Sequence, residues 1–224
     1  AGPEARDVLA AAARGDWSKD AFPWLSLREA HIGIAPATVL GISFSGELAY
    51  EIHVPNESLM AAYTALHAAG DAYGLRVFGG RAVDAMRLEK GFLHWKADIL
   101  TEFDPFETGL DRFVKMDKPE FIGKAALQAR LDAGPKRKLA TLVIDTKDAP
   151  AHGGASVRLE GRIVGTVTSG DWGHRTGLNL AYAFVEPSLA EPETALTVDI
   201  IGAPTPARVI KSGPYDPEYR RMRS

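Results

Sequence analysis

The chain has 224 residues, 46% of them hydrophobic and 25% charged, a composition typical of a soluble globular protein with one large domain or two modest ones. The formal net charge of -3 argues against a nucleic-acid partner bound through a global positive field, and the absence of cysteine excludes disulfides, thiolate metal sites and a cysteine nucleophile. The sequence contains neither a membrane-spanning apolar run nor a signal-peptide pattern, so we expect no membrane partner and a cytoplasmic location.

The first third of the chain predicts short helices and strands. Residues 4–16 read as a helix that ends near Gly15, and residues 18–45 read as a turn and strands punctuated by Pro23, Gly33 and Pro36. Gly46 lies between two strand-like runs and predicts a hairpin turn.

The stretch "GISFSGELAYEIHVP" contains a clean alternation. From Leu48, every second residue through Val54 is apolar, whereas Glu51 and His53 fall on the opposite face. This period of two is typical of a half-buried strand. Glu51 is therefore either a solvated surface carboxylate or a ligand-binding group, and the pattern alone leaves both readings open.

Two helices are predicted next. Asn56 can cap a helix that runs to about Ala69. A second helix follows Gly79 and Gly80 and stops at Gly91. The first should bury an apolar stripe of Leu59, Tyr63, Leu66 and Ala69 or Ala62. The second should turn Val83 and Met86 inward. Its charged side chains Arg81, Asp84 and Arg87, spaced three apart, should form surface pairs.

The second half changes character. Residues 100–118 predict a loop followed by a strand, and residues 121–134 predict a helix that ends at Gly134. From Lys138 onward, short strands alternate with turn signals, which favours a small antiparallel barrel or sandwich. We therefore expect an α+β portion over residues 1–134 and an all-β domain over residues 135–224, divided at Gly134-Pro135.

Motifs for common chemistries are missing. The six histidines lack the spacing of a helical metal pair, and neither a phosphate-binding glycine loop nor a G-x-S-x-G elbow is present. We assign no metal ligand and no catalytic residue. The basic run 136–138 is either a solvated loop or a site for a polyanion, and Trp95 either fills the core or stacks on a planar ring.

Taken together, six motifs resemble the aminomethyltransferase family of the glycine cleavage T-protein. They are "GISFSGELAYEIHVP", "GGRAVDAMRLEKGFLHW", "DPFETGL", "FIGKAAL", "GRIVGTVTSG" followed by "LAYAFV", and "SGPYDPEYRRMR", in family order across almost the whole chain. The similarity is strongest to the folate-binding C-terminal halves of sarcosine and dimethylglycine dehydrogenases. It implies the C-terminal part of the T-protein folate-binding module, an antiparallel sheet with helices, followed by a small β-barrel domain.

The resemblance also implies a ligand and its contacts. Tetrahydrofolate is the expected cofactor, with Glu51 matching the glutamate that binds the pterin ring. A carboxylate suits that role because it can accept two parallel hydrogen bonds from the ring N–H and the 2-amino group. Phe44 and Trp95 match apolar walls of the ring. Lys138 matches an arginine that meets the glutamyl carboxylates.

The resemblance further implies one-carbon transfer from a small methylated amine, by a longer chain whose missing N-terminal portion is a partner of these residues and whose upstream domain could hold FAD. Val83 and Lys138 replace arginines of the glycine-cleavage branch, and no residue matches the family's catalytic aspartate. Two alternatives stay open: a non-catalytic folate-binding or interaction module, and a folate-dependent demethylase of a methylated sulfur compound.

Overall fold

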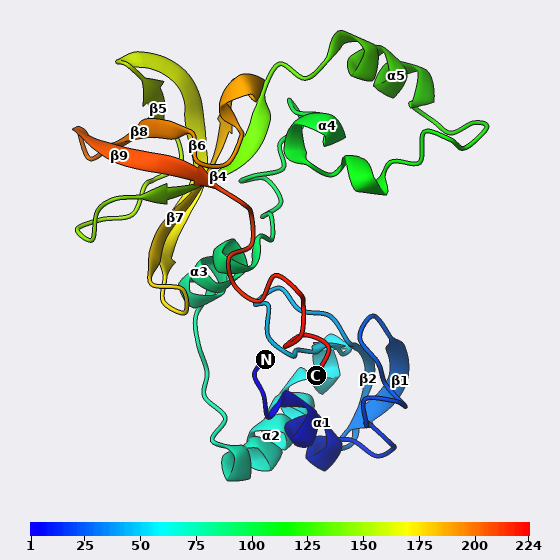
Figure 1. Ribbon diagram of the computed structural model, residues 1–224. Coiled ribbons are helices and arrows are strands. Elements are labelled where there is room, and N and C mark those ends of the chain that lie inside the picture. Colours follow the sequence, from blue (N-terminus) through cyan, green and yellow to red (C-terminus); the bar gives the residue numbers. More distant parts are fainter. The chain divides into compact units, whose positions relative to one another are not determined.

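The computed structural model describes residues 1–224 and divides into two compact units, which are treated separately (Figure 1). Unit 1 comprises Ala1–Lys90 and Tyr215–Ser224, so it contains both chain termini, and unit 2 comprises Gly91–Pro214. The chain therefore passes between the units twice. The predicted domain boundary at Gly134-Pro135 falls inside unit 2 and stays a prediction.

Unit 1 is a small three-stranded antiparallel sheet with helices. The sheet has the order β1-β2-β3, so β3 is an edge strand, and its register places Val39 opposite Ile52. The expected helices and strands are present, although only three residues of the alternating segment pair as a strand and Gly46 lies in a longer loop rather than a hairpin turn. The elements are α1 (Ala5–Ala12), β1 (Leu27–Ile32), β2 (Ala35–Leu40), β3 (Glu51–His53), η1 (Asn56–Ser58), α2 (Leu59–Gly70), η2 (Asp71–Tyr73) and α3 (Gly80–Lys90).

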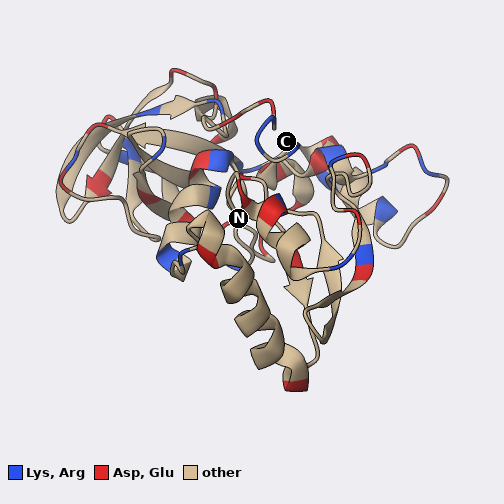
Figure 2. Cartoon of the chain, turned by 90° about the horizontal axis from the view of Figure 1, so that it is seen from below, with Lys and Arg blue, Asp and Glu red and all other residues tan.

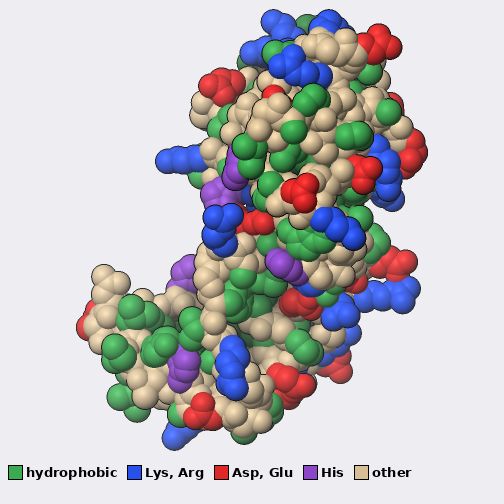
Figure 3. Space-filling model, turned by 90° about the vertical axis from the view of Figure 1, so that its left-hand side faces the viewer, with side chains coloured by type: hydrophobic (Ala, Val, Ile, Leu, Met, Phe, Trp, Pro, Cys, Tyr) green, Lys and Arg blue, Asp and Glu red, His purple; other side chains and the backbone are tan.

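The predicted apolar stripe of α2 is confirmed at Ala62, which is buried in the core of unit 1, and at Leu66, which packs against that core. It is wrong at Leu59 and Tyr63, which are 60% and 52% exposed. A Cβ atom at Gly33 would lie only 3.0 Å from that of Ala65, so α2 packs too close to the β1–β2 turn for large side chains to face it. α2 carries no lysine, arginine, aspartate or glutamate (Figure 2), and Figure 3 shows apolar side chains exposed on the surface of unit 1.

The inward face of α3 also differs from the expectation. Val83 and Met86 are only half-buried, and the apolar positions that are fully buried are Ala85 and Leu88. Arg87 pairs with Asp84 as expected, with Nε 3.4 Å from Oδ1, but Arg87 is buried, so the expectation of a surface pair is wrong at this residue. The last turn of α3 is buried, and a buried charged side chain needs a polar partner.

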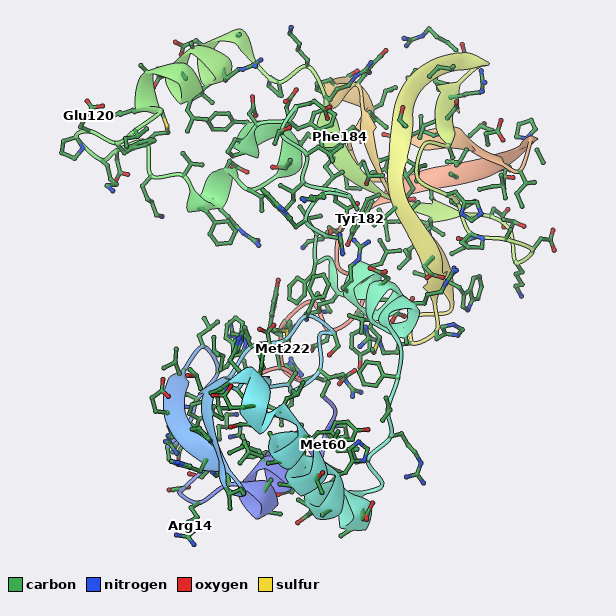
Figure 4. The ribbon with its side chains drawn as sticks, turned by 180° about the vertical axis from the view of Figure 1, so that it is seen from behind. Arg14, Met60, Glu120, Tyr182, Phe184 and Met222 are labelled. Atoms are coloured by element: carbon green, nitrogen blue, oxygen red, sulfur yellow. The ribbon has the colours of Figure 1, made fainter.

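Unit 2 is dominated by a closed six-stranded barrel with the order β4-β7-β6-β5-β8-β9, closed by the pairing of β9 with β4. The predicted strands after Lys138 and the predicted α+β class are confirmed. Tyr182 and Phe184 of β7 are both buried (Figure 4). The elements are α4 (Pro105–Thr108), η3 (Asp111–Phe113), α5 (Lys124–Ala133), β4 (Lys138–Ile144), β5 (Ser156–Leu159), β6 (Arg162–Gly173), β7 (Leu178–Val185), η4 (Pro187–Leu189), β8 (Ala195–Ile200) and β9 (Ala203–Ile210).

The strand predicted within residues 100–118 is wrong, because this segment forms α4 and η3 instead. Asp104 caps α4 by accepting hydrogen bonds from the backbone N–H groups of Phe106 and Glu107, and Glu107 Oε2 accepts the N–H of Asp104 in return. This reciprocal arrangement is a capping box with proline at the first helical position. The residues "DPFE" carry that signal more clearly than any strand pattern.

The β8–β9 hairpin contains a strained residue that a substitution can relax. Ile201 and Gly202 occupy the turn with φ of 52° and 81°, and the Ile201 side chain is 79% exposed. A β-branched residue in the left-handed region is unfavourable, whereas Asn-Gly is preferred in this type of turn. We expect Ile201→Asn to raise the free energy of unfolding by about 1 kcal/mol, measured by urea denaturation. Ile201→Val, which keeps the branching, is the control, and a loss of stability in the asparagine variant would contradict the strain argument.

Candidate functional site

Glu51 lies at the start of the edge strand β3. Its side chain is 52% exposed, and the nearest polar side-chain partner is His53, whose Nε2 lies 3.4 Å from Glu51 Oε2. Leu48 is buried and Ile52 packs against the core of unit 1, so the predicted alternation of faces is confirmed. Glu51 therefore stands on the solvated face of its own unit, with carboxylate oxygens that can accept hydrogen bonds.

The loop of residues 41–50 connects β2 to β3 and carries Phe44, which is half-buried. Two serine side chains fold this loop on itself. Ser43 Oγ accepts the backbone N–H of Gly46 at 3.0 Å, and Ser45 Oγ accepts that of Glu47 at 3.3 Å. Gly46 has φ of 83°, and a Cβ atom there would come within 2.8 Å of the Lys90 side chain. Only glycine fits this position without a shift of the loop.

Residues 94–99 of unit 2 form a tight turn that displays Trp95, whose side chain is 63% exposed. Asp98 holds this turn in place and is completely buried. Its Oδ2 atom accepts the backbone N–H of His94 at 2.9 Å, and its Oδ1 atom accepts the hydroxyls of Thr168 at 2.5 Å and Ser169 at 2.6 Å. The turn is thus pinned to strand β6 by one carboxylate. Because Trp95 is exposed, it does not fill the core of unit 2.

Lys138 is the first residue of β4 and is exposed, with Nζ 3.9 Å from Glu191 Oε1. It lines a cavity of about 340 Å³ in unit 2, together with two further cations, Arg112 and Lys211. Three basic side chains against one carboxylate favour an anionic group in this cavity. Within the same basic run, Arg137 donates from Nη1 to the backbone oxygen of Val164 at 3.0 Å.

Glu107 joins the α4 region to the barrel. Besides capping α4, its Oε1 atom accepts the backbone N–H groups of Lys136 and Arg137, at 3.2 and 3.1 Å. A buried carboxylate that accepts three backbone hydrogen bonds is fully engaged in structure. The basic run immediately before the barrel is therefore held in a fixed conformation.

Sequence reasoning predicted four ligand-binding residues. Phe44 and Glu51 belong to unit 1, and Trp95 and Lys138 belong to unit 2. It missed the side chains that hold these four in place. They are Glu47, Lys90, Asp98, Glu107, Tyr215 and Asp216. All except Asp98 lie inside the motifs quoted above. A capping-box search would have found Glu107, but the partners of the others are distant in sequence.

The structure contains no group of three or more histidine, aspartate or glutamate side chains that could hold a metal ion. None of its helices is long and apolar enough to cross a membrane.

Two family models match the chain. The model described as "GCVT N-terminal domain" matches residues 1–118, and the "Glycine cleavage T-protein C-terminal barrel domain" matches residues 137–216. The second match spans all six barrel strands of unit 2.

Relatives of two kinds are similar to the chain. Human mitochondrial dimethylglycine dehydrogenase is 37% identical over 94% of the chain and 24% of the relative, and aminomethyltransferase from Saccharopolyspora erythraea is 34% identical over 98% and 59%. Among solved structures, aminomethyltransferase T of the glycine cleavage system from Bartonella henselae superposes with a TM-score of 0.85 at 25% identity, over 96% of the chain and 58% of that structure. The chain thus spans about a quarter of the dehydrogenase and less than two thirds of the two aminomethyltransferases.

Proposed function

Because the chain belongs to the aminomethyltransferase family of the glycine cleavage T-protein, we propose that it is part of an enzyme that transfers a one-carbon unit to tetrahydrofolate. The observation that carries this proposal is the place of Glu51. It lies at the end of the family motif "GELAYE", faces outward from an edge strand and contacts only His53 among polar side chains. A pterin offers the two adjacent N–H donors that such a carboxylate can accept.

The other three predicted contacts supply shape and charge. In unit 1, Phe44, on the loop that precedes β3, would offer an apolar face to a flat ring; in unit 2, the exposed Trp95 could stack on a planar ring. Lys138, with Arg112 and Lys211 around the same cavity, would attract the glutamyl carboxylates of the folate tail. Lysine meets a carboxylate as a point charge and lacks the bidentate fork of arginine.

Bound tetrahydrofolate would supply the amine nitrogen that accepts the one-carbon unit. The residues of this chain contribute binding and orientation, which can lower a barrier by several kcal/mol when both reactants are held in contact. Since no residue of this sequence matches the catalytic aspartate of the family, we propose that proton transfer falls to residues outside it.

The methyl donor we propose is a small methylated amine, as the name of the human relative suggests. An oxidant such as FAD would be held by residues outside this sequence. The partner of this sequence would then be the remaining part of the same polypeptide. The predicted location is cytoplasmic, whereas the human relative is named as a mitochondrial protein. Cell fractionation would distinguish the two locations.

Turnover by the intact protein tests the transfer itself. With dimethylglycine or sarcosine, an electron acceptor and tetrahydrofolate, we expect methylenetetrahydrofolate to form faster than by the spontaneous reaction of released formaldehyde with folate. Glu51→Gln measures that spontaneous rate, because it should weaken the folate site without stopping amine oxidation. Equal rates in the two proteins would favour the alternative of a non-catalytic interaction module.

A further inference from the structure

The last ten residues, Tyr215–Ser224, fold back into unit 1 and form a tail with many polar contacts. Met222 is buried there (Figure 4), and the guanidinium of Arg6 donates from Nη2 to the backbone oxygen of Ser224 at 2.9 Å. The backbone N–H of Tyr215 donates to Glu89 O at 3.0 Å, at the end of α3. The tail is therefore an integral part of unit 1.

Lys90 fixes the start of the tail. Its ammonium donates to the backbone oxygen and to the side chain of Asp216, with Nζ to Oδ2 at 3.2 Å, and it lies 4.0 Å from the centroid of the Tyr219 ring. Although burial by itself raises the pKa of Asp216, the hydrogen bond from Lys90 and those from backbone N–H groups of the tail hold that pKa below its usual range. A buried lysine with a carboxylate, a carbonyl and an aromatic ring around it is well compensated.

The tail also contacts the 41–50 loop through the side chain of one loop residue, Glu47. Tyr215 donates its phenolic hydroxyl to Glu47 Oε1 at 2.5 Å, and Arg221 Nη1 lies 3.6 Å from Glu47 Oε2. The Glu47 side chain is only 15% exposed. The Lys90 side chain packs closely against Gly46 of the same loop. Both contacts lie within five residues of Glu51.

We propose that the C-terminal tail is a positioning clamp for the folate-binding loop, in which Tyr215 and Lys90 set the conformation from which Phe44 and Glu51 are presented. This inference rests on the proposed function, because the ligand is the same folate. In this proposal Tyr215 acts through Glu47, so it is a positioning residue. A charge-assisted hydrogen bond of a phenol to a carboxylate is strong and directional, which suits it to hold a loop in one conformation.

Tyr215→Phe removes only this hydroxyl and leaves the ring in place. In the intact protein we expect the Kd for 5-formyltetrahydrofolate to rise about five-fold to ten-fold, while the melting temperature changes little. Hydrogen exchange of the backbone amides in residues 43–48 should accelerate. Tyr73→Phe, at an exposed tyrosine of the same unit, is the matched control and should change none of the three values.

A double-mutant cycle shows whether the effect runs through Glu47. Tyr215→Phe should add nothing to Glu47→Ala, whereas independent effects would multiply and overturn the proposal. Unchanged exchange and unchanged affinity in Tyr215→Phe would overturn it as well. If the unsubstituted protein binds no folate, the proposed function fails, and the exchange of residues 43–48 still decides whether the tail orders the loop.

Discussion

Replacing Asp98 by alanine is expected to lower the free energy of unfolding of unit 2 by about 3 to 5 kcal/mol, measured by urea denaturation. The substitution leaves three donors without their acceptor in a completely buried place: the backbone N–H of His94 and the hydroxyls of Thr168 and Ser169. Thr168 keeps a second acceptor, the backbone oxygen of Tyr182 at 3.3 Å, so part of the loss is recovered. The turn that displays Trp95 should loosen at the same time.

Two variants bracket this result. Asp98→Asn keeps an acceptor oxygen and should fall between the original protein and the alanine variant. Asp117→Ala, which removes an exposed carboxylate of the same unit, should change stability by less than about 0.5 kcal/mol. A loss below about 1 kcal/mol in Asp98→Ala would contradict the view that this carboxylate pins the turn to the barrel.

Replacing Glu51 by glutamine is expected to weaken folate binding by about 1.5 to 3 kcal/mol, or roughly 10-fold to 150-fold in Kd, with little change in stability. The amide can offer only one acceptor oxygen and carries no charge, so it loses one of the two parallel hydrogen bonds to the pterin and weakens the other. Stability should hold because the carboxylate is half-exposed and contacts only His53 among polar side chains. Equilibrium titration and thermal melting measure the two quantities.

Glu57→Gln is the matched control, since Glu57 is an exposed glutamate of the same unit. It should leave folate affinity unchanged. If Glu51→Gln behaves like this control, Glu51 is an ordinary solvated carboxylate of the outer face of β3.

Local pattern predicted most of the fold. The barrel strands after Lys138 alternate or are continuously apolar, and turn signals separate them, so both period and turn chemistry point the same way. The failures have local causes as well. In α2, close approach to the β1–β2 turn favours small side chains at Ala62 and Ala65, and Leu59 and Tyr63 are exposed, contrary to expectation. In the 100–118 segment, the capping signal of Asp104 outweighs the apolar residues that suggested a strand.

For the candidate site, the sequence predicted exposed residues better than buried ones. Motif similarity singled out the exposed residues Glu51 and Trp95 as candidates, because such groups are recognised by type and spacing; their role stays a prediction. The buried residues behind them escaped, since Asp98 meets its partners 70 and 71 positions away and Glu47 meets Tyr215 at a distance of 168. No periodicity carries contacts of that kind, and only the folded chain brings "FLHWKAD" to "GTVTSG", or "GELAYE" to "PYDPEYRR".

Calorimetric titration of tetrahydrofolate into the intact protein tests the central claim most directly. We expect saturable binding at a single site per chain, with the heat signal strongly reduced in Glu51→Gln and retained in Glu57→Gln. Absence of binding by the intact protein would contradict the assignment of a folate-dependent one-carbon transferase. The family fold would then have a different function in this protein.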